Sequence, residues 1–193
     1  ARPDGDGWVL NGSKTYISNG ILSDLVVVAA RTDPEKPHGI SLFLVERGMD
    51  GFERGRSLEK MGLKSQDTAE LFFNDVHIPR ANLLGEEHQG FRYLTRFLAQ
   101  ERLVGSIGFL ANAQHAFDVT LDYVKERRAF GKPIGAFQNT RFQMAQMRAE
   151  LDMLQTFVDQ CVMLLNAGEL TAEDASSAKL LTSEIEGRVT DTC

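Results

Sequence analysis

The chain has 193 residues, of which 42% are hydrophobic and 25% are charged, and these proportions are typical of a folded globular protein. Its formal net charge of -6 argues against nucleic acid as the main partner, because such binding depends on clustered lysine and arginine. No uncharged apolar stretch is long enough to cross a bilayer, so we expect no membrane span.

Cysteine and histidine usage predicts neither a disulfide framework nor a metal site. Cys161 and Cys193 are too few for such a framework, and they fit a reducing interior. The four histidines share no metal-ligand spacing with each other or with the cysteines. Because the chain starts in a polar loop and stops inside a helical pattern without a capping residue, we expect both ends to be cuts in a longer protein.

The first predicted element is a β-hairpin near the N-terminus. The apolar run Trp8–Leu10 leads to Asn11-Gly12 and then to Thr15–Ile17, and Asn-Gly between such runs is a strong hairpin signal. A second Asn-Gly pair, at positions 19 and 20, predicts the end of the second strand.

Further strands follow, separated by turn signals. They are predicted over residues 25–30, 40–45 and 70–78, and Pro79 closes the last one. A succession of short strands favours an antiparallel sandwich or barrel, which we assign to residues 1–84.

The pattern changes to a helical period in residues 85–193. One long helix is predicted over 89–128, ending before Gly131 and Pro133, and a second over 138–166. The second carries an apolar heptad seam, which we interpret as core: Met144, Met147, Leu151, Leu154, Val158, Cys161 and Leu165.

A third helix follows Gly168, which has the residue type of a helix C-cap. Thr171 and Asp174 form the pattern of a capping box at its start. Its apolar positions are Ala175, Ala178, Leu181, Ile185 and Val189. The predicted fold class is therefore α+β, a partial antiparallel β-barrel or sandwich domain (1–84) followed by an antiparallel bundle of long helices (85–193).

Glu101 is the most informative residue for function, because it lies on an apolar face of the first long helix. The positions three and four away are Phe97, Leu98, Val104 and Gly105, none of which can neutralise it. An apolar setting disfavours the charged form of a carboxyl group and can make it a useful general base. Alternatively, Glu101 pairs with an arginine from another element or is simply exposed to solvent. Gly105 and Gly108 leave room on the same face for something flat or extended.

A basic cluster marks the end of the first long helix. Arg127, Arg128 and Lys132 surround Phe130 and Gly131. Cations are favourable at a helix C-terminus, which alone accounts for them. The same group could instead grip a pyrophosphate while Phe130 covers an adenine. No dinucleotide-binding glycine motif, phosphate-binding loop or nucleophile elbow accompanies it.

Three stretches of the chain resemble the flavin-dependent acyl-CoA dehydrogenases in order and spacing. They are GWVLNGSKTYISNG, KMGLKSQDTAELFFNDVHIP and ERRAFGKPIGAFQ. The similarity runs from the middle β domain of that family into its C-terminal helical domain and covers essentially the whole chain. Residues 60–64, 66–73 and 100–103 are most similar to the long-chain type.

The resemblance implies an FAD site and an oligomer. Tyr16 and Ser18 match positions that lie against the flavin ring, and the two-residue period of a strand places both on one face. Arg127 and Phe130 match residues that reach the FAD of a neighbouring subunit, and Gln138 matches a further FAD contact. Because each cofactor site would then combine two chains, a homo-oligomer is expected, a tetramer as in the family.

The resemblance also implies the reaction. Glu101 matches the catalytic base of the long-chain and isovaleryl types, which removes the α proton of a fatty acyl-CoA to give trans-2-enoyl-CoA. Arg102, Gln66 and Leu98 match substrate-contacting positions. The expected electron acceptor is electron-transferring flavoprotein. We expect the 193 residues alone to be inactive and to bind FAD weakly or not at all.

Two alternatives to a long-chain enzyme stay open. One is an isovaleryl or other branched short-chain dehydrogenase, which uses the same glutamate position. The other is a non-catalytic, flavin-poor oligomerisation module. The expected location is the bacterial cytoplasm, with the mitochondrial matrix as the alternative.

Overall fold

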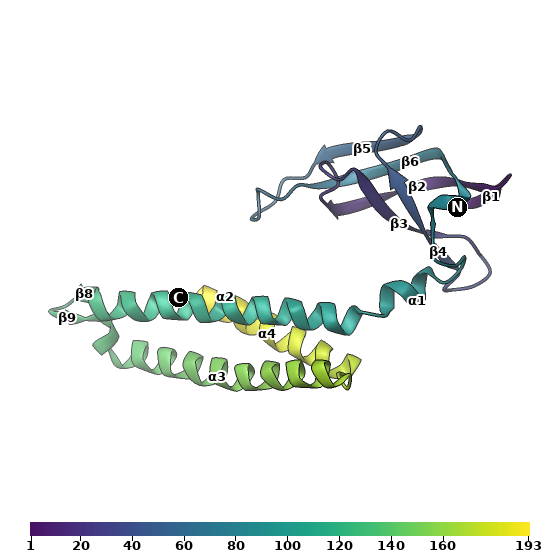
Figure 1. Cartoon of the computed structure of the whole chain (residues 1–193). Helices are drawn as coiled ribbons and strands as arrows, with labels where there is room; N and C mark the ends of the chain where they lie inside the picture. Colours follow the sequence, from purple (N-terminus) through teal and green to yellow (C-terminus); the bar gives the residue numbers. More distant parts are fainter. The chain divides into compact units, whose positions relative to one another are not determined.

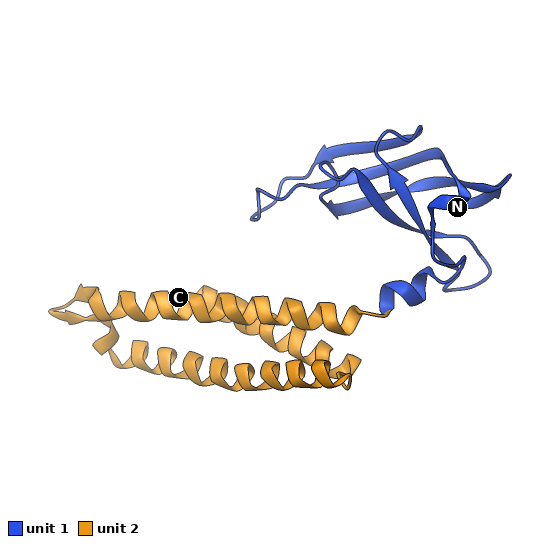
Figure 2. Ribbon diagram, viewed as in Figure 1, with its two compact units in different colours: residues 1–95 blue, residues 96–193 orange.

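The computed structural model describes all of residues 1–193, which divide into two compact units, residues 1–95 and 96–193 (Figure 2). The first unit is built mainly from strands and the second mainly from helices (Figure 1). The predicted α+β class is thereby confirmed. These units are defined by the contacts within each of them and not by domain boundaries. The predicted domain boundary after residue 84 therefore stays a prediction. None of the helices combines the length and the hydropathy that a membrane crossing requires.

Unit 1 contains two antiparallel sheets, neither of which closes into a barrel. The first has the order β1 (Arg2–Asp4), β2 (Gly7–Ser18), β6 (Thr68–Ile78) and β5 (Phe52–Ser57). The second has the order β3 (Leu25–Arg31), β4 (Ile40–Glu46) and β7 (Leu83–Leu84), and a short 3-10 helix, η1 (Arg80–Asn82), precedes β7. Their shared core includes Trp8, Phe43, Leu71 and Phe73, each at most 5% exposed.

The hairpin predicted at Asn11-Gly12 is wrong, because β2 runs straight through this pair. Its pairing with β6 shifts register between Leu10 and Gly12, where the single residue Asn11 lies opposite Asn74 and Asp75, so the extra residue of this β-bulge is in β6. Asn11 stabilises the bulge by exchanging two hydrogen bonds with Asp75, each 2.9 Å long. The turn lies earlier, between β1 and β2, where Gly5 has a positive φ of 58°.

The other predicted strands are confirmed within a few residues as β3, β4 and β6. The predicted strand end at the second Asn-Gly pair is also confirmed, because β2 stops at Ser18 and Asn19 has a φ of 60°. The edge strand β5 was not predicted. Only Phe52 of its residues is buried, so its sequence lacks the alternation that marks a half-buried strand.

The single helix predicted over 89–128 is two helices, α1 (Gly90–Thr95) and α2 (Leu98–Glu126). The break is at Phe97, whose φ of -111° and ψ of 10° lie outside the α-helical region. Apolar residues continue through the break at helical spacing, so the periodicity could not reveal it.

Unit 2 is a three-helix bundle of α2, α3 (Gln138–Ala167) and α4 (Ala172–Thr192). A small hairpin, β8 (Arg128–Ala129) and β9 (Lys132–Pro133), and a 3-10 helix, η2 (Ile134–Ala136), connect α2 to α3 (Figure 1). Arg102 of α2 donates to Ser176 of α4, and Asn112, ten residues later in α2, donates to Glu186, ten residues later in α4. The helix α4 therefore runs parallel to α2.

The helix ends follow the predictions. Gly168 caps α3 with a φ of 74°, and Thr171 and Asp174 form the capping box of α4. The predicted seam of α3 is buried at Met147, Leu151, Leu154, Val158 and Cys161.

The predicted core position Leu181 is wrong. Its side chain is 45% exposed, and Thr182 is fully buried instead. Burial of Thr182 is possible because its hydroxyl donates to the carbonyl of Ala178 at 2.7 Å.

Candidate functional site

Glu101 lies in the first turn of α2, on a face that points away from the bundle core. The buried side of α2 is a separate stripe: Leu103, Ser106, Leu110, Ala113, Phe117 and Val124. Glu101 is exposed and takes part in no ion pair or side-chain hydrogen bond. Of the alternatives from sequence, an arginine partner is therefore excluded within unit 2, in which Glu101 is exposed.

The face around Glu101 is nevertheless apolar. Phe97 is 53% exposed and Val104 is 61% exposed, and with Gln100 they line an open depression of about 490 Å³ that includes Glu101. A Cβ atom added at Gly108 would meet nothing within 4 Å. The surface beside the carboxylate is thus open and hydrophobic, which is unusual for the solvent-facing side of a helix.

Leu98 and Arg102 flank Glu101 on the same helix. Leu98 is the first residue of α2 and is half-buried. The guanidinium of Arg102 donates to the hydroxyl of Ser176 at 3.2 Å, which directs it toward α4. The substrate contacts expected from both residues stay predictions.

The opposite end of α2 brings Arg127, Phe130 and Gln138 together. Arg127 is the C-cap of α2, Phe130 occupies the tip of the β8–β9 hairpin, and Gln138 opens α3. The carbonyl of Arg127 accepts from the N–H of Ile134 at 2.8 Å, which closes the hairpin onto the helix end. All three side chains are exposed, and Phe130 is 94% exposed.

The basic residues of this end have different surroundings. Arg128 donates to the carbonyl of Gly131 at 3.0 Å, and the ammonium of Lys132 lies 4.3 Å from the ring centre of Phe137. These contacts shape the hairpin locally. Arg127 forms no ion pair, so its guanidinium is free to bind an anion.

Tyr16, Ser18 and Gln66 lie in unit 1, around the end of β2. Tyr16 is 78% exposed and has a φ of 61°, within a register irregularity between Lys14 and Ile17. The regular alternation that placed Tyr16 and Ser18 on one face is therefore interrupted. Ser18 is paired with Thr68 across the sheet, and Gln66 lies in the exposed loop just before it.

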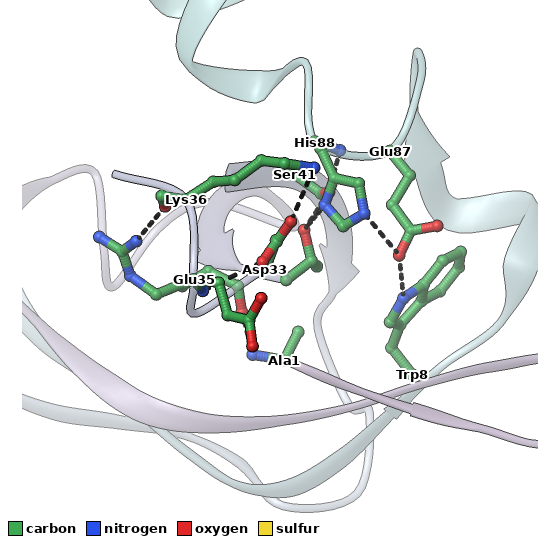
Figure 3. Close-up of polar contacts among 10 residues, drawn as sticks. Ala1, Trp8, Asp33, Glu35, Lys36, Ser41, Glu87 and His88 are labelled. Carbon is green, nitrogen blue, oxygen red and sulfur yellow. Dashed lines mark hydrogen bonds and ion pairs between the residues drawn. The ribbon is translucent and has the colours of Figure 1, made fainter. Parts of the chain in front are cut away.

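A second polar cluster lies in unit 1, where the loop before α1 meets β3 and β4 (Figure 3). Ser41 is fully buried, and its hydroxyl lies 2.7 Å from that of Thr32 and accepts from the backbone N–H of His88 at 2.8 Å. The Thr32 hydroxyl also lies 2.8 Å from Nδ1 of His88. Because these groups satisfy one another, the cluster fastens the loop and leaves no free reactive group.

Comparison with known proteins identifies the family. The middle domain of acyl-CoA dehydrogenases matches residues 1–76, and the C-terminal domain of acyl-CoA dehydrogenases matches residues 88–193. The chain belongs to the acyl-CoA dehydrogenase family. The resemblance noted in the sequence is thereby confirmed, and the predicted antiparallel strands and helical bundle are those of this family.

Two curated relatives illustrate the range of the family. The mitochondrial long-chain specific acyl-CoA dehydrogenase of Sus scrofa is 46% identical, and the match covers 100% of this chain and 46% of the relative. The mitochondrial short/branched chain specific acyl-CoA dehydrogenase of Rattus norvegicus is 36% identical and matches 100% of this chain and 45% of its own length. The chain thus spans about half the length of the curated relatives it matches.

Solved structures agree with this assignment. An acyl-CoA dehydrogenase from Geobacillus kaustophilus superimposes with a TM-score of 0.95 at 48% identity, over 99% of this chain and 51% of that one. A glutaryl-CoA dehydrogenase from Mycobacterium smegmatis, in complex with FADH2, superimposes with a TM-score of 0.91 at 30% identity, over 100% and 48%.

Sequence patterns missed one group of residues near the candidate site. Arg47, Arg54 and Asp67 hold the turn that follows β2, although they come from three different segments. Only the Asn-Gly pair at 19 and 20 indicated a turn here, and nothing in the sequence indicated which side chains would bind it.

Proposed function

We propose that this chain forms part of an FAD-dependent enzyme that converts a long-chain acyl-CoA to the trans-2-enoyl-CoA, with Glu101 as the catalytic base. The observation that carries the proposal is an unpaired carboxylate beside the exposed apolar side chains of Phe97 and Val104. A charged group in such a setting has no structural partner to stabilise it. The long-chain preference rests on 46% identity to the long-chain relative against 36% to the short/branched-chain one.

The base function follows from what a bound acyl chain would do at this face. An acyl chain lying along Phe97 and Val104 would exclude water from the Glu101 carboxylate. Loss of hydration favours proton uptake by a carboxylate, and proton uptake is the role that we propose for Glu101. Gly108 leaves space for the chain to extend along the helix.

The residues proposed to bind FAD have suitable chemistry. Tyr16 and Phe130 offer exposed aromatic faces, Ser18 offers a hydroxyl, and Arg127 offers an unpaired guanidinium for a pyrophosphate. When bound, FAD supplies the acceptor for the hydride that leaves the β carbon. Gln138 is the first residue of α3, at the same end of the bundle, where it would add a polar contact.

The length of α2 supports a site shared between two chains. Glu101 and Glu126, the last residue of α2, are about 37 Å apart along the helix, at a rise of 1.5 Å per residue. Arg127 and Phe130 therefore cannot reach the flavin ring that meets the Glu101 of their own chain. A homo-oligomer, a tetramer in our proposal, would bring the two ends of α2 from different chains to one cofactor.

Removal of electrons from the reduced cofactor requires a redox partner. We assign this role to an electron-transferring flavoprotein. A solved structure described as the electron transferring flavoprotein of Acidaminococcus fermentans superimposes on this chain with a TM-score of 0.90 at 38% identity. We place the protein in a bacterial cytoplasm, with the mitochondrial matrix as the alternative in view of the mitochondrial relatives.

The proposal is tested by anaerobic mixing of the complete gene product with acyl-CoA thioesters of increasing chain length. Flavin absorbance should bleach fastest with long straight-chain substrates. If the bleaching rate is highest with isovaleryl-CoA or another short branched substrate, the branched-chain alternative is favoured. This alternative is supported by the 36% identity to a short/branched-chain relative. A purified oligomer without any flavin would favour the oligomerisation module and contradict the proposal.

A further inference from the structure

The turn at residues 19–24, which joins β2 to β3, is fixed by side chains from outside it. The Asp67 carboxylate accepts from the backbone N–H of Ile21 at 2.6 Å. The backbone carbonyl of Asp67 accepts from the N–H of Asn19 at 3.0 Å. One residue therefore satisfies two N–H groups of the turn and ties them to the start of β6, the strand that pairs with β2.

Two arginines hold the carbonyls of the same turn. Arg54 donates to Gly20 at 2.9 Å and to Ser23 at 2.7 Å. Arg47 donates to Ile21 and to Ser23, each at 2.9 Å. Burial lowers the pKa of Arg54, and the charge of Arg47 lowers it further. The carboxylate of Asp24, which lies 2.6 Å from Nε of Arg47, counteracts part of this repulsion.

Packing leaves this turn little freedom. Gly20 is buried, and a Cβ atom added to it would lie 3.0 Å from the carbonyl oxygen of Ile17 and 3.1 Å from the Cβ of Ala69. Asn19 has a φ of 60°, in the left-handed region. The backbone after Ser18 is thus determined by contacts on several sides.

The turn lies between the segments proposed to contact the flavin and the substrate. Ser18 is paired with Thr68, the residue after Asp67, and Gln66 is the residue before it. Asp67 therefore joins both segments through one side chain and one peptide group.

We infer that Asp67 is a positioning residue, whose carboxylate fixes the end of β2 so that Tyr16 and Ser18 meet the flavin ring in a single orientation. This inference rests on the proposed function. The Tyr16 backbone is already irregular, with a φ of 61°, so its ring direction depends on where the strand end is held.

The second carboxylate oxygen provides a way to separate geometry from charge. Oδ1 of Asp67 is buried and has no hydrogen-bond donor, so only Oδ2 carries the contact to the turn. Asparagine keeps one acceptor oxygen of the same reach. Substitution Asp67→Asn should therefore keep the hydrogen bond to Ile21 and the position of the turn. Substitution Asp67→Ala removes this hydrogen bond.

The experiment compares Asp67→Ala, Asp67→Asn and Arg47→Gln in the complete gene product with FAD. Visible circular dichroism of the flavin and its reduction rate by acyl-CoA are measured per bound flavin. Asp67→Ala should change the dichroism and slow reduction by about tenfold or more, because small misplacements of reacting groups are costly. Asp67→Asn should restore both to within about twofold.

Arg47→Gln is the matched control, because it removes hydrogen bonds to the carbonyls of Ile21 and Ser23 in the same turn but leaves both hydrogen bonds of Asp67 in place. It should lower the melting temperature but leave both values per bound flavin unchanged. Unchanged values for Asp67→Ala, or equal changes for Arg47→Gln, would show a merely structural tie and overturn the inference alone.

Two further outcomes are defined. If Asp67→Ala does not fold, Asp67→Glu takes its place, since it keeps the charge and displaces the carboxylate by one methylene; unaltered dichroism in that variant overturns the inference. A wild-type protein that binds no flavin overturns the inference together with the proposed function.

Discussion

Phe130 is unfavourable in two respects, its exposure to solvent and its backbone conformation, and no contact within this chain offsets either of them. Its side chain is 94% exposed, and its φ of 50° is in the left-handed region, where non-glycine residues are strained by about 1–2 kcal/mol. Its one aromatic contact is an edge-on approach to Phe137, with ring centres 6.2 Å apart. A large aromatic residue held in this way is available to stack on a ligand.

Substitution Phe130→Ala should therefore weaken FAD binding by about tenfold, which corresponds to about 1.4 kcal/mol of stacking. The melting temperature without FAD should not fall, because little surface of Phe130 is buried. Titration of the apoprotein with FAD, followed by fluorescence, measures the change. Leu180→Ala is the control, since Leu180 is 59% exposed on α4 and has no proposed contact with FAD. Equal affinity for wild type and Phe130→Ala would argue against an FAD contact.

At the scale of elements, the contact between α3 and α4 includes a charged pair with a defined pH dependence. Glu150 accepts from Gln146 at 3.1 Å and from Arg188 at 2.6 Å. The hydrogen bond from Gln146 lowers the pKa of Glu150 most, and the hydrogen bond and charge of Arg188 lower it further. A carboxyl whose pKa is lower in the folded protein adds stability above its unfolded value, and this stability is lost as the pH falls through the folded value.

Glu150→Gln should accordingly destabilise the bundle by about 0.5–1 kcal/mol at pH 7. The difference from wild type should shrink as the pH is lowered below about 4. Denaturant unfolding across this pH range, with Glu184→Gln as an exposed control on α4, measures it. A difference that stays constant with pH would mean that Arg188 and Gln146 do not stabilise the charged form.

The bundle was more predictable from the sequence than the sheets. Helix periodicity and caps act within a few residues, so Gly168 and the Thr171–Asp174 box indicated the right ends. Asn11-Gly12 misled because the pair is a hairpin signal on local sequence alone. Its actual place, within β2 and opposite a bulge in β6, depends on pairing with Asp75, 64 positions later.

The candidate site shows the same division. Glu101 and Phe130 could be singled out because each is chemically out of place in its own segment. Asp67 could not, because its role depends on hydrogen bonds to Ile21 and Asn19, which are more than forty positions earlier in the sequence. Exposure of Glu101 was one of the alternatives given from the sequence, but helical periodicity could not decide it, since it gives a face and not what covers that face.

At the scale of the whole molecule, the two ends of α2 predict that active sites are shared between chains. Glu101 and Phe130 lie at opposite ends of this helix, so each site would take Glu101 from one chain and Phe130 from another. A mixed pair of one Glu101→Gln chain and one Phe130→Ala chain then contains one fully intact site.

Co-expression of the two variants should recover roughly a quarter of the wild-type activity, since half of randomly formed pairs are mixed and each has one intact site. Each variant alone should show far less, at flavin concentrations too low to saturate Phe130→Ala. Acyl-CoA oxidation by the co-purified oligomer measures the recovery. Activity no higher than the mean of the two variants would indicate that Glu101 and Phe130 do not act across chains.

The most direct test of the whole account is the rate of flavin reduction by a long-chain acyl-CoA in Glu101→Gln, measured by anaerobic stopped flow in the complete gene product. Glutamine keeps the size of the side chain but cannot accept the α proton, so bound FAD should remain and its reduction should slow by at least about a hundredfold. Glu126→Gln, at the other end of α2, should reduce its flavin at the wild-type rate. Reduction of Glu101→Gln at the wild-type rate would contradict the assignment of Glu101 as the catalytic base.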